Sequence, residues 1–238
     1  MTTIETNLQQ VRSRMAAACS QADRDVNAVT LLAVSKTFGP DAVADALAAG
    51  QTAFGENYIQ EGVEKILALR ASHPQAVITW HCIGPVQSNK TRLVATHFDW
   101  VQSVDRLKIA QRLSEQRPAD LPPLQVCLQV NVDGGANKSG VTPDELPALA
   151  AAVAALPNLK LRGLMCIPEP ADGFDAQLAV FQQARALFDA LNVQGLGLDT
   201  LSMGMSEDLD AAIAGGSTMV RVGRAVFGHR PLKTAATA

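Results

Sequence analysis

The residue best suited to chemistry in this chain is a lysine that ends a short apolar run. Leu31–Val34 are all apolar, and Ser35 and Lys36 follow them directly. A short apolar run bounded by polar residues is typical of a strand buried on both faces. A lysine at its carboxyl end binds an anion as an ammonium or, as a neutral amine in a dry pocket, attacks a carbonyl to form a Schiff base. The alternative is a strand-end lysine that simply reaches solvent.

A segment near the C-terminus, LSMGMSEDLDAAI, has the composition of a phosphate-binding loop. Ser202, Gly204 and Ser206 lie between an apolar run and a helical pattern that we expect to open with Glu207 and Asp208. Small residues let the backbone approach an anion, and hydroxyl groups and the free N–H groups of a helix start donate to it. Alternatively, Ser206 is an ordinary N-cap and Glu207 complements the helix dipole.

The following segment, VRVGRAVFG, places Arg221 inside the last apolar run, with Gly223 and Arg224 just beyond it. Gly223 suits close approach to an anion, but it equally suits a tight turn. A buried arginine needs a partner, so Arg221 either pairs with an acidic neighbour or donates to a ring nitrogen of a cofactor. Together with Lys36, the two segments predict a binding site for a ligand that has both a phosphate group and an aldehyde group.

These residues must be positioned by elements that alternate along the chain. After a helical pattern over residues 3–22, strand-like and helical patterns follow one another in about eight units. The strand-like patterns cover residues 29–34, 52–54, 77–83, 98–102, 124–130, 160–165, 200–203 and 219–222. The helical patterns cover residues 41–49, 58–70, 89–96, 105–115, 143–155, 174–191 and 207–214, and the signal after the last strand is weak.

This alternation predicts parallel strands, and about eight units at this length predict a single (β/α)8 TIM barrel with an extra N-terminal helix. An open doubly wound sheet is the alternative, but its GxGxxG fingerprint after the first strand is absent. We expect one domain over residues 1–238, with the N-terminal helix at 1–22 and a loose tail at 232–238. Since strands one, seven and eight are neighbours in a closed barrel, Lys36 and both C-terminal segments should meet at its carboxyl face.

Composition excludes several classes of function. The 238 residues are 47% hydrophobic and 18% charged with a net charge of −3, so no basic nucleic-acid surface is expected. No apolar run approaches the ~20 residues of a membrane span, and the polar N-terminus does not resemble a signal peptide. The four cysteines lack metal-ligand spacing, so we expect no metal site and reduced thiols in a cytoplasmic protein.

Four segments together resemble one family, the pyridoxal-phosphate homeostasis proteins, also described as YggS-like or proline-synthetase-co-transcribed proteins. They are LLAVSKT with FGENYIQE, WHCIGPVQSNKTR, LRGLMCIP, and LSMGMSEDLDAAIAGGSTMVRVGRAVFG, and they span nearly the whole chain. The resemblance implies a barrel similar to the N-terminal domain of alanine racemase and other fold-type III pyridoxal-phosphate enzymes.

The resemblance also implies roles for particular residues. Lys36 would form the internal aldimine with pyridoxal 5'-phosphate, and Arg221 would face the pyridine nitrogen and keep it unprotonated. The remaining expected cofactor-binding residues are Ser202 and the backbone N–H groups of Gly223 and Arg224 at the phosphate, Asn57 near the ring, and Met203, Gly204 and Ser206 at the phosphate end.

Two positions depart from the family pattern. Pro85 stands where the family usually has histidine or a similar residue, so its side chain has no expected role. Arg224 stands where a small hydroxyl residue is common, which leaves only the backbone donor. Lys90 and Lys138 match lysines of the family, and we assign neither a function.

The resemblance favours a carrier over an enzyme. Racemisation on this fold needs a base on each face of the substrate carbon, and the resembling racemases take the second, a tyrosine, from an additional domain. This chain ends at residue 238, and its only tyrosine is Tyr58. We therefore expect a monomeric protein that stores or delivers pyridoxal phosphate, with pyridoxal-phosphate-dependent apoenzymes as possible recipients. The alternatives are a weak racemase and a cofactor-free aldolase that uses Lys36.

Overall fold

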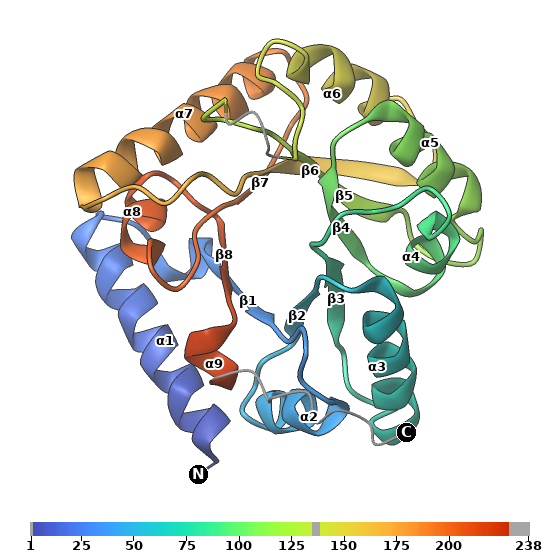
Figure 1. The fold of residues 1–238 in the computed structure, drawn as a ribbon, viewed down its shortest axis with the longest axis vertical. Helices are drawn as coiled ribbons and strands as arrows, with labels where there is room; N and C mark the ends of the chain where they lie inside the picture. The colour runs from blue at the N-terminus through green and yellow to red at the C-terminus, as the bar shows by residue number, and fades with distance from the viewer. Residues whose placement is uncertain (1, 135–138, 229–238) are drawn as a thin grey trace, which may run out of the picture.

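Eight parallel strands form a closed barrel in which each strand pairs with the next along the chain and β8 pairs with β1 (Figure 1). The computed structural model describes residues 2–134 and 139–228. Helices surround the strands, so the fold is the TIM barrel that the alternating pattern predicts. The strands are β1 Thr30–Val34, β2 Ala53–Glu56, β3 Thr79–Cys82, β4 Trp100–Val104, β5 Leu124–Gln129, β6 Leu159–Met165, β7 Thr200–Ser202 and β8 Met219–Val222.

The helices cover the outside of the barrel (Figure 1). They are α1 Thr3–Gln21, α2 Pro40–Ala48, α3 Ile59–Ser72, α4 Thr91–His97, α5 Leu107–Gln116, α6 Leu146–Ala154, α7 Phe174–Val193, α8 Leu209–Ala214 and α9 Arg224–Phe227, with a 3-10 turn, η1, at Val26–Ala28. None of the helices in the described part of the chain is long and apolar enough to cross a membrane.

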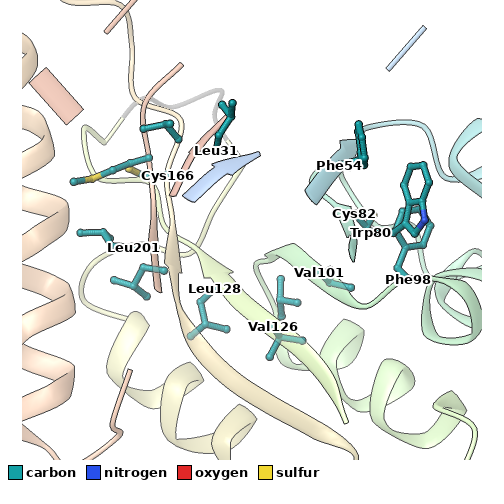
Figure 2. Close-up of a cluster of buried hydrophobic side chains, with 14 of the residues drawn as sticks. Leu31, Phe54, Trp80, Cys82, Phe98, Val101, Val126, Leu128, Cys166 and Leu201 are labelled. Atoms are coloured by element: carbon teal, nitrogen blue, oxygen red, sulfur yellow. The ribbon is translucent and has the colours of Figure 1, made fainter. Parts of the chain in front are cut away.

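Alternation along β1 separates two apolar layers. Leu31 and Ala33 belong to the large core between strands and helices. Figure 2 shows part of that core, where Leu31 is drawn with side chains from several other strands. Leu32 and Val34 belong instead to a small cluster with Ile83 and Met219. Because successive side chains of a strand point to opposite faces, the even-numbered positions of β1 point into the barrel.

Helix α1 packs outside the barrel beside α8, α9 and α2 (Figure 1). Thr2 caps it, since the Thr2 hydroxyl oxygen accepts a hydrogen bond from the Glu5 backbone N–H at 3.1 Å. Its buried face carries Leu8, Val11, Met15, Ala18 and Cys19. The weak helical signal after the last strand corresponds to the four-residue α9, and α1 covers the barrel wall that so short a helix leaves open.

The loop after β7 is longer than the sequence suggests. Helix α8 begins at Leu209 and its N-cap residue is Asp208, so the expected start at Glu207 is wrong and Ser206 is not the N-cap. The Asp208 carboxylate accepts the backbone N–H of Met205 at 2.6 Å. That contact closes a turn inside the loop, so the helix begins two residues later than expected. The expected loose tail at residues 232–238 lies outside the described residues.

Candidate functional site

A cavity of about 560 Å³ opens at the carboxyl ends of the strands. Its volume falls within the range of roughly 300–1,000 Å³ usual for small-molecule sites. It is lined by Val34, Lys36, Asn57, Ile83, residues 167–173, Gln177, Val180, Phe181, residues 205–208, Arg221, Gly223 and Arg224. A smaller cavity of about 260 Å³ lies at the amino ends of β1 and β2 and contains none of the expected site residues.

Six of the nine expected site residues line the larger cavity, and they come from strand β8, from the start of α9 and from the loops after β1, β2 and β7. These six are Lys36, Asn57, Ser206, Arg221, Gly223 and Arg224. Lys36 continues the inward-facing series of Leu32 and Val34, which explains why it reaches the cavity.

The other three expected residues, Ser202, Met203 and Gly204, are buried beside the cavity and do not line it. Met203 belongs to the hydrophobic core. Gly204 has a φ of +94°, and a Cβ atom there would lie 2.4 Å from the Cβ of Ala212. Its carbonyl accepts the backbone N–H of Arg221 at 2.9 Å. Met203 and Gly204 therefore pack beneath the loop after β7, on the side away from the cavity.

Arg221 is 4% exposed and is held by neutral partners. Its Nη1 donates to the hydroxyl oxygen of Ser202 at 2.8 Å, and its Nη2 donates to the carbonyl oxygen of Cys166 at 2.8 Å. Among the described residues, none forms an ion pair with Arg221, so the acidic-partner alternative lacks support. Burial lowers the pKa of Arg221 from its ordinary value, although a guanidinium still does not lose its proton in a protein.

A hydrogen-bonded chain continues from Arg221 through the barrel interior. Because Arg221 can only donate, the Ser202 hydroxyl donates onward to Gln102 Oε1, at 2.6 Å. That contact orients the Gln102 amide, whose Nε2 lies 2.9 Å from His81 Nδ1 and donates to it. Burial lowers the pKa of His81 to about 3, in agreement with a neutral ring that accepts. His81 also stacks on Trp100 with a centroid distance of 5.0 Å.

Sequence reasoning missed Gln102 and His81. Each is an isolated polar residue inside an apolar strand, in WVQSV and WHCIG. The signal available was their place in the strand alternation, which assigns both to the barrel interior together with Arg221.

The loop after β6 was also largely missed. Residues 167–173 form one wall of the cavity, whereas the sequence analysis included only Ile167 and Pro168, the last two residues of the segment LRGLMCIP. The loop has little periodicity, so its path across the barrel mouth follows from the tertiary structure alone.

Two features suit the cavity to a polar ligand with an anionic group. A Cβ atom at Gly223 would lie 3.3 Å from the Val34 carbonyl oxygen, so glycine lets the start of α9 approach β1 closely. The first N–H groups of any helix have no acceptor within that helix, which leaves those of α9 available. Asn57 Oδ1 is buried and has no hydrogen-bond partner within the described ranges, so a ligand donor could satisfy it.

Comparisons with known proteins find related sequences and structures. The family model "Alanine racemase, N-terminal domain" matches residues 3–231. The pyridoxal phosphate homeostasis protein of Pseudomonas aeruginosa is 59% identical over 230 residues, which cover 97% of each chain. Its namesake in Vibrio cholerae is 53% identical and covers 97% of this chain and 98% of its own.

A solved structure resembles the barrel over nearly its full length. PipY of Synechococcus elongatus, whose structure has pyridoxal phosphate (PLP) bound, is 35% identical with a TM-score of 0.81, and the match covers 95% of this chain and 100% of PipY. The chain thus belongs to the family of the pyridoxal phosphate homeostasis proteins, built on the alanine racemase N-terminal fold.

Proposed function

We propose that this protein binds pyridoxal 5'-phosphate as a Schiff base on Lys36 and takes part in vitamin B6 homeostasis without robust catalytic turnover. The observation that carries the proposal is the common cavity shared by Lys36, Arg221 and the start of α9. When bound, the cofactor supplies an aldehyde and an aromatic ring that can act as an electron sink.

The chemistry of the donor set fits this ligand. Lys36 supplies the amine for the aldehyde, and Arg221, buried and permanently charged, supplies a donor for the ring nitrogen. The N–H groups of Gly223 and Arg224 would bind the phosphate, with the Ser206 hydroxyl beside them. The unpartnered Asn57 Oδ1 could accept from the hydroxyl group of the ring. PLP bound to PipY and the names of the curated relatives support the same ligand.

The position of Ser202 changes its proposed role. Its hydroxyl group is occupied by Arg221 and Gln102, and it does not line the cavity. We propose that Ser202 contributes by orienting the guanidinium of Arg221, and that the phosphate contacts fall to the loop residues that reach the cavity.

No tyrosine lines the described cavity, which supports a carrier. Tyr58 is the only tyrosine of the chain, is 55% exposed and does not line the cavity. Arg221 beside the ring nitrogen would weaken the ring as an electron sink. The match to the alanine racemase domain nevertheless makes a weak racemase the second candidate.

The setting of the protein is also part of the proposal. We propose a monomer that works in the cytoplasm and passes its cofactor to PLP-dependent apoenzymes. The four cysteines are all buried and form no disulfide bond, which suits a reducing compartment.

The proposal is tested by titrating the protein with PLP and following the absorbance of the imine. We expect the wild type to develop the imine band and lose it on borohydride reduction, whereas Lys36→Ala develops none. Lys90→Ala is the matched control, because Lys90 does not line the cavity, and it should behave as the wild type. A wild type that stays colourless at saturating cofactor would contradict the proposal and favour a cofactor-free aldolase.

Turnover separates the two candidate functions. Incubation of the holoprotein with single isomers of alanine and serine should give no robust racemisation. Racemisation that Lys36→Ala abolishes would instead identify the protein as an enzyme.

A further inference from the structure

A buried ion network lies directly behind the two peptide groups that flank Lys36. Its cation is Lys65 of α3, which is 2% exposed. The Lys65 Nζ lies 2.6 Å from Glu56 Oε1, 3.1 Å from Glu61 Oε1 and 2.8 Å from the carbonyl oxygen of Ser35. An ammonium has three donors, so the described contacts use all of them. Lys65 is therefore a structural cation with no donor left for a ligand.

The network fixes the backbone on both sides of Lys36. Before it, the carbonyl of Ser35 accepts from the Lys65 ammonium. After it, the backbone N–H of Thr37 donates to Glu61 Oε1 at 2.6 Å. Hydrogen bonds with one charged partner are shorter and stronger than neutral ones, so both peptide planes next to Lys36 have strong orienting contacts.

The turn that these contacts hold is strained. Thr37 has a φ of +71°, a left-handed conformation that a β-branched residue rarely adopts. The Thr37 hydroxyl is buried and finds no hydrogen-bond partner among the residues at 2–134 and 139–228. Such conformations persist only where the surrounding structure imposes them, and they concentrate at functional sites. Two contacts impose this one: the Glu61 carboxylate accepts the Thr37 N–H, and the Phe38 N–H donates to the Ser35 carbonyl oxygen at 3.1 Å across the turn.

We propose that Glu61 and Lys65 are positioning residues that aim the amine of Lys36 into the cavity. This inference rests on the proposed function and deepens it. In the condensation, the neutral amine of Lys36 would add to the aldehyde carbon. A C=N bond would replace the C=O bond, and the aldehyde oxygen would leave as water together with the two amine protons. The rate depends on the approach of the amine, and a misplacement of about 1 Å can slow a reaction by roughly a hundredfold.

Two substitutions at Glu61 separate positioning from a general structural effect. Glu61→Ala removes the acceptor for the Thr37 N–H, while Glu61→Gln keeps an oxygen at that place. Glu64→Ala is the matched control, since Glu64 is an exposed glutamate of the same helix. The rate of imine formation is measured with PLP, and affinity is measured with pyridoxine phosphate, whose alcohol cannot form an imine.

We expect Glu61→Ala to form the imine at least about tenfold more slowly, with nearly unchanged affinity for pyridoxine phosphate. Glu61→Gln should recover most of the rate, and Glu64→Ala should match the wild type. Imine formation by Glu61→Ala at the wild-type rate would overturn the inference. A loss of affinity for pyridoxine phosphate as large as the loss of rate would also overturn the inference, because it would indicate a collapsed cavity.

A second readout needs no cofactor and therefore distinguishes this inference from the proposed function. Hydrogen exchange of the Thr37 amide should be faster in Glu61→Ala than in the wild type and Glu61→Gln. If the wild type binds pyridoxine phosphate but forms no imine, the proposed function fails, and the exchange data still decide the role of Glu61. Equal exchange in all three proteins overturns that role.

Discussion

Arg221 is the residue whose environment most constrains the chemistry of the site. It is buried, permanently charged and aimed by Ser202 and the Cys166 carbonyl. A charged donor next to a ring nitrogen disfavours protonation of that nitrogen, whereas a carboxyl group there would favour it. In the proposed complex, Arg221 would therefore hold the cofactor in its less electron-withdrawing form.

Arg221→Glu should therefore shift the absorbance spectrum of the bound cofactor, because the ring nitrogen can then be protonated. The measurement is a pH titration of the spectrum in the holoprotein, with urea unfolding to establish that the variant is folded. An unchanged spectrum together with unchanged affinity would exclude a contact between Arg221 and the ring.

His81 makes the free energy of unfolding depend on pH in the acid range. Its pKa is lowered from 6.5 to about 3 by burial, so between those pH values the unfolded chain binds a proton that the folded protein does not. The contribution of the neutral His81 to the free energy of unfolding is therefore fully present above pH 6.5, and it decreases as the pH falls toward 3. The loss from this one group is up to about 1.4 kcal/mol per pH unit.

His81→Asn should reduce this loss, since asparagine can accept from Gln102 but cannot be protonated. The free energy of unfolding of both proteins is measured by urea denaturation at a series of pH values from neutral to acid. The difference between them isolates His81 from the other titrating groups. Parallel pH profiles for the two proteins would show that His81 is not buried as a neutral ring.

The polar chain through the barrel illustrates which parts of the site the sequence could not predict. Lys36 and Gly223 were predictable, because each follows an apolar run at a strand end. The contact between Gln102 and Ser202 joins residues a hundred positions apart. It exists only because the closed barrel brings side chains from several strands into one interior layer, so local patterns carry no sign of it.

At the scale of elements, the loop after β3 positions the loop after β2. A Cβ atom at Gly84 would lie 2.1 Å from the backbone carbonyl oxygen of Asn57. Neither backbone can move freely, because Ile83 donates its N–H to the Glu56 carbonyl at 2.9 Å. The absence of a side chain at Gly84 thus lets Asn57 reach the cavity.

Gly84→Ala should consequently displace Asn57, lowering the free energy of unfolding by about 1–3 kcal/mol and weakening PLP binding. Gly39→Ala is the matched control, because a Cβ atom there meets nothing within 4 Å. Urea denaturation and cofactor titration measure both effects. Equal stability and affinity in the two variants would mean that the loops adjust without cost.

The elements themselves were largely predictable from periodicity. Each strand and helix lies within a few residues of its expected position, because the strands are short segments rich in apolar residues and the helices have amphipathic spacing. The exceptions were helix starts. Asp208 diverts the loop before α8 through a side-chain contact with the Met205 N–H, and such a local contact overrides the helical pattern.

At the scale of the whole molecule, the N-terminal helix completes the ring of helices. Asn7 Nδ2 donates to the Val226 carbonyl at 2.9 Å, and Arg14 pairs with Asp210 at 2.6 Å. These contacts join the first helix to the last two. Residues near both ends of the described chain therefore stabilise the wall that closes the barrel, between β8 and β1. That residues 1–238 form a single domain stays a prediction.

Leu8→Ala should lower the free energy of unfolding by about 2–5 kcal/mol, because the side chain is fully buried between α1 and the barrel. Gln9→Ala, at an exposed neighbouring position, should change it by no more than about 0.5 kcal/mol. Thermal or urea unfolding gives both values. Similar small changes in the two variants would show that α1 is a dispensable appendage.

The most direct test of the account is to locate the covalent bond. The protein is saturated with PLP, reduced with borohydride and digested, and its peptides are analysed by mass spectrometry. The account predicts a pyridoxyl group on Lys36, and none on the corresponding peptide of Lys36→Ala. An adduct confined to another lysine, or cofactor-saturated protein in which Lys36 stays unmodified, would contradict it.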